Sequence, residues 1–592
     1  MIAEEIQMYT VLGVMLALVI GLILDKIRPH FLFFGAALII MVLGILNPKD
    51  FLSSFANESL ATIFVLILLT AALNNNFNIL KYLDSLFVQK NKPRLFIFQM
   101  TSVVSLMSSV MNNTPIVAMM IPYMMRWSKK MQVSPSKLLI PLSFAAISGG
   151  MITVIGTSTN LVLNGFIESK GEEPFAFFTF FVPGLLVSFI GVIFLSTLGF
   201  NLLKSRKNPL DVVQSNLKEY LVEVILSPES NKVGKSIQDA GLRNLQGVYL
   251  VEILRNSELI SSVSPAEVLE ENDRLFFAGD TTDILEIVKE DSGFQFSKTH
   301  QYNLEGKLEI VEVLIPYNST LSGRTLKESN FREKYDAAVI AIHRNGERLR
   351  GKLGEINLTS GDLLLLTAGN NFQRLSTLDN NLYALGIKDQ IGKTPKFKSN
   401  ILLLMSILSI GAVITGFISF FVGLLVILST FIGLGLMSQK ELLKNLNIDL
   451  FMILGCAIAL GTAFIDTGGA KFVSDAVVDI FSAYGNISVI LGIYFLTVIL
   501  TSFITNAAAI SIVFPIAYEM SHSLSIEPNA IYLAIAFAAS CSFLTPFGYQ
   551  TNLMVFGPGG YKFKDFIRIG TPMTVLYSAT CLSYIFIHYN II

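Results

Sequence analysis

The chain has 592 residues, of which 52% are apolar and only 15% are charged, and its mean hydropathy is +0.60. Soluble domains carry about 25% charged residues, so this composition indicates an integral membrane protein. The net charge of −1 gives no electrostatic basis for binding nucleic acid. The three cysteines lie in apolar stretches and the five histidines form no metal-binding motif, which argues against a disulfide framework and a zinc site.

Windows of about 20 apolar residues predict membrane-spanning helices. Ten stretches are of this kind: 8–24, 31–47, 59–74, 139–168, 176–201, 399–417, 419–437, 449–466, 530–556 and 570–588. Two further stretches, 95–125 and 487–517, are interrupted by polar residues, and we expect each to form a re-entrant hairpin. Residues 205–397 are charged and rich in β-branched residues, which predicts an insert outside the membrane.

The two hydrophobic halves repeat each other. Residues 108–122 align with residues 501–515, so that Asn113 corresponds to Asn506, 393 residues later. Further along, Thr159-Asn160 corresponds to Thr551-Asn552 with an offset of 392. We therefore expect four parts: a first membrane repeat (1–204), two insert domains (205–300 and 301–397) and a second membrane repeat (398–592).

Lysine and arginine flank the first interrupted stretch and are nearly absent around the second. The first is flanked by Lys81, Lys90, Lys92, Arg94, Arg126, Lys129, Lys130 and Lys137, and the second by Lys471. Because cytoplasmic loops collect these residues, we expect the first hairpin on the cytoplasmic side and the second outside. The same rule predicts a cytoplasmic insert, with both termini outside the cell (inner) membrane. Inverted repeats of this kind are typical of secondary transporters.

The insert is duplicated as well. Residues 222–236 recur as 311–325 with an offset of 89, and Arg255 corresponds to Arg344. Short strand patterns separated by turn residues predict two small α+β domains. No Rossmann glycine motif or Walker lysine loop occurs, so neither a dinucleotide site nor an ATP motor is indicated. We expect both arginines at hairpin turns, and a contact with an effector phosphate is the alternative.

Four places combine chain breakers or small residues with hydroxyl and amide side chains: residues 112–115, 156–160, 505–507 and 545–552. Irregular backbone at membrane depth is tolerated only where protein buries it or where it lines a cavity. Helix ends there would offer N–H groups to an anion, and carbonyl and hydroxyl oxygens would suit Na⁺. Polar side chains also join membrane helices without any ligand. Their repetition at matched positions favours a binding site.

The predicted spans hold almost no charged residues, and Asp449 and Asp466 lie at segment ends. Proton-coupled carriers usually keep a buried carboxylate or histidine relay, so its absence favours coupling to Na⁺ over H⁺. An anion bound without arginine has to be held by N–H groups, hydroxyls and amides, which suits a small oxyanion or carboxylate. The glycine-rich residues 557–561 predict a tight cytoplasmic turn, with a hinge as the alternative reading.

At these residues the chain resembles the divalent anion/sodium symporter family of the ion transporter superfamily, which carries a Ser-Asn-Thr motif at each hairpin tip. The matching residues are Asn112-Asn113-Thr114 and Thr505-Asn506-Ala507. The implied fold is an α-helical polytopic membrane protein, an inverted-repeat transporter with about ten spans and two re-entrant hairpins. Asn112 and Ala507 depart from the motif, so we expect a pocket unlike that of a standard succinate transporter.

The resemblance also implies the site residues. Those for Na⁺ would be Ser108, Asn112, Asn113, Gly156, Thr501, Thr505, Asn506 and Thr545. Those for the substrate would be Asn113, Thr114, Thr157, Ser158, Thr159, Asn506, Thr551 and Asn552. We expect a transporter, not an enzyme, that carries a small divalent oxyanion with Na⁺ by an elevator-like movement, sulfate first and a dicarboxylate second.

The insert resembles paired TrkA-C (RCK-C) domains. This implies a homodimer in the lipid bilayer and regulation by a nucleotide effector such as cyclic di-AMP. Three alternatives stay open. One is a gated anion channel or exchanger, against which the sequence has no T-V-G-Y-G filter. Another is an arsenite-type efflux permease, which neither paired cysteines nor an acidic relay supports. A sensor that does not transport would leave two intact hairpins without a use.

Overall fold

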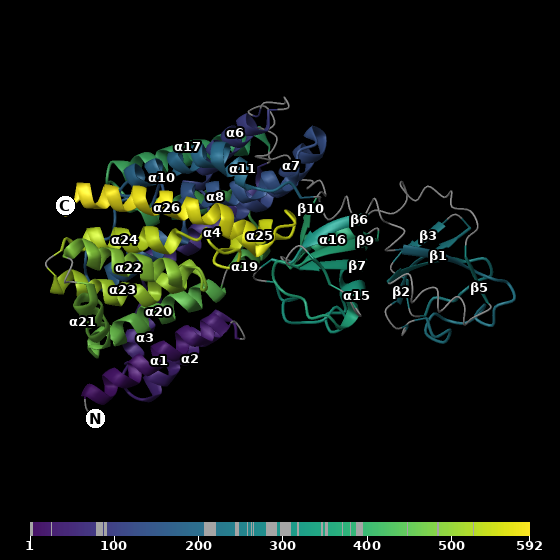
Figure 1. Cartoon of the computed structure of the whole chain (residues 1–592), viewed down its shortest axis with the longest axis horizontal. Helices are drawn as coiled ribbons and strands as arrows, with labels where there is room; N and C mark the ends of the chain where they lie inside the picture. The colour runs from purple at the N-terminus through teal and green to yellow at the C-terminus, as the bar shows by residue number, and fades with distance from the viewer. Residues whose placement is uncertain are drawn as a thin grey trace.

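The computed structural model contains a bundle of helices beside two small β-sheet modules (Figure 1). It describes the whole chain except residues 1–3, 25–26, 78–86, 88–91, 207–220, 243–244, 246–247, 257, 262, 265, 280–292, 297–309, 317–318, 345–346, 350–352, 370, 379–380, 386–394, 447, 482–484, 525 and 592. Lys81 and Lys90, which contribute to the predicted orientation, and the predicted boundary at residues 300 and 301 lie outside the described residues.

The first half of the chain forms helices at every predicted apolar stretch. They are α1 (Glu4–Leu24), α2 (Pro29–Val42), α3 (Pro48–Phe55), α4 (Glu58–Asn76), α6 (Pro93–Ser108), α7 (Asn113–Met131), the short η1 (Pro135–Lys137), α8 (Leu139–Gly150), α9 (Ser158–Ser169), α10 (Phe181–Phe194), the π-helical η2 (Leu195–Gly199) and α11 (Phe200–Leu202).

The second half contains a corresponding series. Its helices are α17 (Lys396–Ile414), α18 (Phe420–Gly433), α19 (Gln439–Asn445), α20 (Ile448–Asp466), α21 (Gly469–Phe481), α22 (Asn486–Thr501), α23 (Asn506–Ser523), α24 (Pro528–Ser540), α25 (Gln550–Phe556) and α26 (Phe563–His588). α6 and α22 both begin and end 393 residues apart, and α4 and α20 begin and end 390 residues apart. The repeat therefore extends beyond the motifs that reveal it in the sequence.

Within the described residues, five helical stretches are long and apolar enough to cross a membrane: Glu4–Leu24, Pro48–Leu73, Phe181–Leu202, Lys396–Val413 and Ile448–Asp466. Shorter apolar helices are Pro29–Val42, Phe420–Gly433, Asn486–Thr501 and Pro528–Ser540. The stretches predicted at 139–168 and 530–556 are each broken into two helices at their polar residues, α8 with α9 and α24 with α25. The count of ten crossings stays a prediction.

α8 and α24 lie at the centre of the helical body. Every residue of α8 is buried, and so is α24 from Ala530 onward. Their sequences are apolar or small on all sides, the pattern of a helix surrounded by protein. Each central helix packs against its own hairpin, α8 against α6 and α24 against α22 and α23. The breaks that follow α8 and α24 are thereby held inside the protein.

Residues 221–385 contain two five-stranded antiparallel sheets. The first has the order β3-β2-β4-β1-β5 and the second β10-β6-β9-β7-β8, which is the same order of equivalent strands. The strands are β1 (Leu221–Leu226), β2 (Val248–Arg255), β3 (Glu258–Ser261), β4 (Arg274–Gly279), β5 (Phe294–Phe296), β6 (Ile310–Leu314), β7 (Ala337–Arg344), β8 (Glu347–Arg348), β9 (Leu363–Ala368) and β10 (Tyr383–Leu385).

The second sheet is accompanied by the short helices α15 (Phe331–Tyr335), η4 (Leu353–Glu355) and α16 (Phe372–Leu378). The duplication extends to irregular features, because the sheets share a β-bulge, between Leu250 and Glu252 and between Val339 and Ala341. We call residues 221–296 the first module and residues 310–385 the second module. The second module lies between the helical body and the first module (Figure 1).

Candidate functional site

Ser108 and Asn113 fix the tip of the first hairpin. α6 ends at Ser108, α7 begins at Asn113, and both side chains are buried. The Ser108 hydroxyl lies 2.8 Å from the Ala146 carbonyl oxygen of α8 and also contacts Asn113 Oδ1. A hydroxyl has one proton, so it satisfies only one of these two acceptors at a time. Three oxygen atoms, those of the Ser108 hydroxyl, the Asn113 amide and the Ala146 carbonyl, thus lie together with a single hydroxyl proton to share.

The second hairpin repeats this arrangement. The Thr501 hydroxyl lies 2.8 Å from Asn506 Oδ1 and 2.6 Å from the Ala539 carbonyl oxygen, which is the equivalent of Ala146. The Ser542 hydroxyl also donates to Asn506 Oδ1, at 2.8 Å. Ser108 and Thr501, which correspond in the sequence repeat, therefore also make equivalent contacts in their own hairpins.

Backbone oxygens complete a cluster around Gly156. A Cβ atom built on Gly156 would overlap the Gly150 carbonyl oxygen and lie 2.7 Å from the Ser108 carbonyl oxygen. One built on Gly150 would lie 2.8 Å from Asn113 Oδ1 and 3.2 Å from the Gly156 carbonyl oxygen. Neutral carbonyl, amide and hydroxyl oxygens are the ligands with which transporters coordinate Na⁺. These residues fit a Na⁺ ion.

An equivalent cluster surrounds Gly548. A Cβ atom on Gly548 would lie 2.6 Å from the Thr501 carbonyl oxygen and 3.2 Å from Thr545 Oγ1. Thr545 itself donates to the Ser502 carbonyl oxygen at 2.8 Å and accepts from the Gly548 N–H at 3.0 Å. Gly150 was not predicted as a site residue, and Gly548 was predicted only as part of the break at 545–552. The structure identifies both, because a larger side chain at either position would collide with these oxygens.

Asn112 and Thr505, both predicted Na⁺ ligands, are helix caps. Asn112 Oδ1 accepts from the Thr114 N–H at 3.2 Å, and Thr505 Oγ1 accepts from the Ala508 N–H at 3.4 Å. Side chains at this position satisfy N–H groups that have no partner within the helix. They shape the tips of α7 and α23, and their role as Na⁺ ligands stays a prediction.

The first hairpin tip touches the second repeat directly. Asn113 Nδ2 donates to the Tyr549 hydroxyl at 2.9 Å, and the Thr114 hydroxyl donates to Gln550 Oε1 at 3.2 Å. Tyr549 and Gln550 are half-buried and immediately precede or begin α25. Both lie in the break predicted at 545–552, but neither was selected there as an individual site residue. The available signal was their place in the repeat, where they correspond to Thr157 and Ser158.

Thr551 and Asn552 are fully buried and bind to the protein itself. Ser143 of α8 donates to Thr551 Oγ1 at 2.8 Å and to Asn552 Oδ1 at 2.7 Å as alternative acceptors. Asn552 Nδ2 donates to the carbonyl oxygens of Ser542 (2.6 Å) and Thr545 (3.1 Å). The two residues therefore pin α25 to α8 and close the loop around Gly548, and direct substrate contact stays a prediction.

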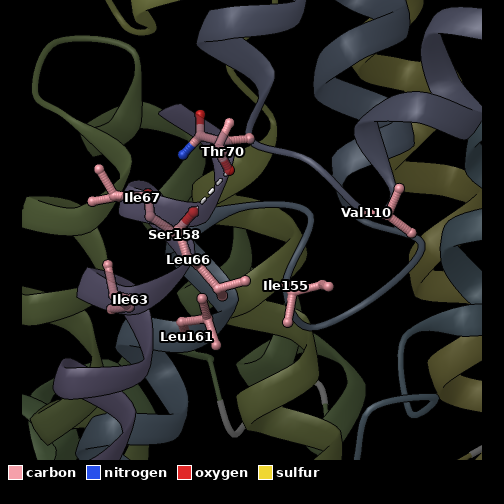
Figure 2. A pocket seen from close by; sticks show the side chains of 9 residues that line it. Ile63, Leu66, Ile67, Thr70, Val110, Ile155, Ser158 and Leu161 are labelled. Atoms are coloured by element: carbon pink, nitrogen blue, oxygen red, sulfur yellow. Dashed lines mark hydrogen bonds between the residues drawn. The ribbon is translucent and has the colours of Figure 1, made fainter. Parts of the chain in front are cut away.

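In the first repeat, Thr157 caps α9 by accepting from the Thr159 N–H at 3.5 Å, and Thr159 is fully buried beside it. The Ser158 side chain points into a pocket between α4 and the hairpin tip (Figure 2). Asn112 also lines this pocket, and the rest of its wall is largely apolar: Ile63, Leu66, Ile67, Thr70, Val110, Ile155 and Leu161. The residues that α4 contributes to this wall are thus apolar except Thr70, whose hydroxyl donates to the Leu66 carbonyl oxygen.

The second module packs onto α25 and the turn that follows it. Leu314 and Leu363 belong to the same buried apolar cluster as the membrane-type helices. A Cβ atom on Gly557 would lie 3.4 Å from Leu363 Cβ, and one on Gly361 would lie 2.8 Å from Leu553 Cδ1. The glycine-rich turn predicted at 557–561 is therefore a contact surface between the helical body and the insert.

Arg255 and Arg344 are held by buried carboxylates. Arg255 binds both oxygens of Asp273 at 2.9 Å, and Arg344 binds those of Asp362 at 2.7 and 2.8 Å. Hydrogen bonds to these carboxylates raise the pKa of both guanidinium groups. Arg255 uses Nε, Nη1 and Nη2 within its module, and Arg344 uses Nε and Nη2. These contacts give both arginines a structural role, and the alternative that they bind an effector phosphate stays untested.

Residues 19–536 and 418–591 match the family described as citrate transporter (CitMHS). The chain belongs to this family. A protein of Synechocystis sp. named as an uncharacterized transporter is 33% identical over 559 residues, which cover 91% of this chain and 90% of that protein. A Chlamydomonas reinhardtii protein named as a sulfur deprivation response regulator is 30% identical over 557 residues, covering 91% and 94%. Sodium/sulfate cotransporter 1 of the same organism is 26% identical over 377 residues, covering 60% and 42%.

Membership of the citrate transporter family confirms the prediction of a transporter of the ion transporter superfamily. The finer placement among divalent anion/sodium symporters and the TrkA-C nature of the insert stay predictions. The family match runs through both hydrophobic halves, which contain the two hairpins and both oxygen clusters.

Proposed function

We propose that this member of the citrate transporter family is a Na⁺-coupled symporter of a small divalent oxyanion, with sulfate as the first candidate. The observation that carries the proposal is the pair of equivalent oxygen clusters, around Gly156 and Gly548, each beside a hairpin-tip asparagine. Relatives named as sodium/sulfate cotransporters, at 22–27% identity, support the same ion and anion.

The clusters also suggest how the two gradients are coupled. A divalent anion in a site of low dielectric constant is costly unless its charge is compensated. In this proposal two Na⁺ ions provide the compensation, one in each cluster, and neutral N–H donors orient the anion between them. The empty carrier and the fully loaded carrier are then the two states that bury the least uncompensated charge, so these are the states that cross the membrane. An elevator-like movement would carry the loaded hairpins across the membrane.

A carboxylate is the second candidate, and the family description favours it, because the family is described as transporting citrate. Carboxylates and sulfate are bound by the same kinds of group, namely N–H donors and Na⁺. Sulfate is shorter than a dicarboxylate, so the space between the hairpin tips determines which of the two anions the site accepts.

We further propose that the insert is cytoplasmic, in a protein of the inner membrane, and regulates transport as TrkA-C domains would. The contact of the second module with Leu553 and Gly557 supports this role, because Leu553 lies in α25 next to Thr551 and Asn552, and Gly557 directly follows that helix. A shift of the module would therefore act on the helix that closes one oxygen cluster. A homodimer and a nucleotide effector are part of the proposal.

Uptake by purified protein in liposomes tests the function. Labelled sulfate is offered with and without an inward Na⁺ gradient, and unlabelled succinate, citrate, thiosulfate and arsenite are the competitors. We expect concentrative, Na⁺-dependent sulfate uptake that is lost in Asn113→Ala and Asn506→Ala and retained in Thr197→Ala. Thr197 is exposed, and among the described residues its hydroxyl donates to the Ile193 and Phe194 carbonyl oxygens of the preceding helical turn. Undiminished uptake in both asparagine variants would contradict the site.

A further inference from the structure

The two hairpin-tip asparagines differ in one contact. Asn113 Nδ2 donates to the Tyr549 hydroxyl, whereas Asn506 Nδ2 makes no hydrogen bond within the part of the chain that the structure describes. Asn506 is 4% exposed. Its Nδ2 keeps some accessible surface and has no acceptor among the described residues, so a ligand oxygen could reach it and accept a hydrogen bond. The site therefore has an unused donor on the second hairpin and an occupied one on the first.

The difference follows from the loops that face the tips. Tyr549 and Gln550 of the second repeat stand where the first repeat has Thr157 and Ser158. The larger pair reaches across and fills the space next to Asn113 and Thr114, as the two hydrogen bonds show. On the second hairpin the residue equivalent to Thr114 is Ala507, which is smaller. On the first hairpin Thr114 is thus bonded to a side chain of the second repeat, whereas the equivalent residue of the second hairpin has no hydroxyl to form such a bond.

The filling side chains bring their own donors. The Tyr549 oxygen accepts from Asn113 Nδ2, which leaves the Tyr549 hydroxyl proton for donation to another oxygen. Gln550 uses its carbonyl oxygen for Thr114, and within the described residues its amide nitrogen has no acceptor. Hydrogen bonds from neutral donors to an anion contribute more than those between neutral groups.

We propose that Tyr549 and Gln550 form one wall of the anion site, donate hydrogen bonds to the anion, and limit it to the size of a tetrahedral oxyanion. The anion lies nearer the second hairpin, where Ala507 leaves room and Asn506 offers its N–H. Ala507 and Tyr549 then compensate for each other in size. Ala507 is smaller than its counterpart Thr114, and Tyr549 is larger than its counterpart Thr157. The inference rests on the proposed function, since it names what selects the substrate of that same site.

The test replaces the two residues of the proposed wall. Tyr549→Thr and Gln550→Ser give the second repeat the side chains of the first, and Tyr549→Phe removes only the hydroxyl. Tyr584→Phe on α26 is the matched control, because its ring is half-buried and stacks on His588 outside the site. Labelled sulfate and labelled succinate uptake are measured in proteoliposomes under one inward Na⁺ gradient, and size-exclusion chromatography confirms that each variant is folded.

We expect Tyr549→Phe to lower the kcat/KM for sulfate about tenfold, as the loss of one hydrogen bond to a charged group requires. Tyr549→Thr should raise the ratio of succinate to sulfate uptake about tenfold or more, with Gln550→Ser acting in the same direction. Folded variants whose ratio stays within about twofold of the wild type would overturn the inference and leave the function intact. A wild type that takes up neither anion would overturn the proposed function, and the inference with it.

Discussion

Gly156 and Gly548, which lie 392 residues apart, each face the carbonyl oxygen of the residue that ends a hairpin's first helix. For Gly156 that residue is Ser108, and for Gly548 it is Thr501. Neither glycine has a positive φ, so backbone conformation does not require it. The requirement comes from space, because a Cβ atom would occupy the place where oxygens of the hairpin and loop converge.

Substitution of these glycines should therefore remove Na⁺ binding. We predict that Gly156→Ala and Gly548→Ala each raise the Na⁺ concentration for half-maximal uptake more than about tenfold, since each methyl group displaces backbone oxygens that cannot rotate away. Uptake titrated against Na⁺ measures the effect. Gly13→Ala is the control, because among the described residues nothing beyond its own helix turn lies within 4 Å of a Cβ atom there. Wild-type Na⁺ dependence in both variants would show that the clusters bind no cation.

The unused donor of Asn506 gives a second prediction. Asn506→Asp keeps an oxygen for the Thr501 and Ser542 hydroxyls and replaces the N–H group with a negatively charged oxygen. We expect the KM for the anion to rise about tenfold or more, because like charges repel, while Na⁺ binding is retained. Uptake measured at varied anion and Na⁺ concentrations separates the two effects. An unchanged KM for the anion would mean that Asn506 does not face it.

The second module should restrain α25. Leu553→Ala shortens the side chain that fits against Gly361 of the module. We predict that the uptake rate rises about threefold, a coupling within the range typical of contacts between distant sites, with no change in the preference among anions. The initial rate of uptake in proteoliposomes is the measurement. Leu404→Ala, at an exposed position of α17, is the control and should leave the rate unchanged. An equal rate in Leu553→Ala and wild type would remove the support for regulation through this contact.

The arginine–aspartate pairs should stabilise the modules rather than bind an effector. We predict that Asp362→Asn destabilises the second module by about 3 kcal/mol, because it leaves Arg344 without the charge that its two bonds require. Asp273→Asn should do the same in the first module. Protease cleavage of the insert in the full-length protein, measured against urea concentration, reports the change. Glu271→Gln, an exposed substitution, is the control. Equal urea midpoints for Asp362→Asn and Glu271→Gln would contradict this role.

Features that both repeats share could be predicted from the sequence. The hairpin residues Ser108 and Thr501, the tip asparagines and the breaks after α8 and α24 recur at offsets of 392 or 393 residues. The structure gives Ser108 and Thr501 equivalent contacts, each with its tip asparagine and with a carbonyl oxygen of the central helix. Repetition is informative here because one helical geometry is built twice. The length of each helix was less predictable, since burial inside the protein allows a short apolar helix such as α25.

Features in which the repeats differ were missed. Tyr549 has no counterpart of its own type, because the first repeat has Thr157 there, so alignment of the halves marks the position without indicating a side chain that reaches the other repeat. Its contact with Asn113 joins residues 436 positions apart and depends on how the repeats pack together. The docking of Leu363 near Gly557 is of the same kind. Contacts between units follow from tertiary packing, and local patterns do not encode them.

The central claim is that the two oxygen clusters couple Na⁺ to the movement of a small divalent anion. The most direct measurement is labelled sulfate uptake by the wild-type protein in liposomes, with an inward Na⁺ gradient and with the same salt on both sides. We predict accumulation above the external concentration only when the gradient is present, and its loss in Gly548→Ala. Sulfate equilibration without accumulation, at the same rate with and without the gradient, would contradict the account and indicate a channel or exchanger.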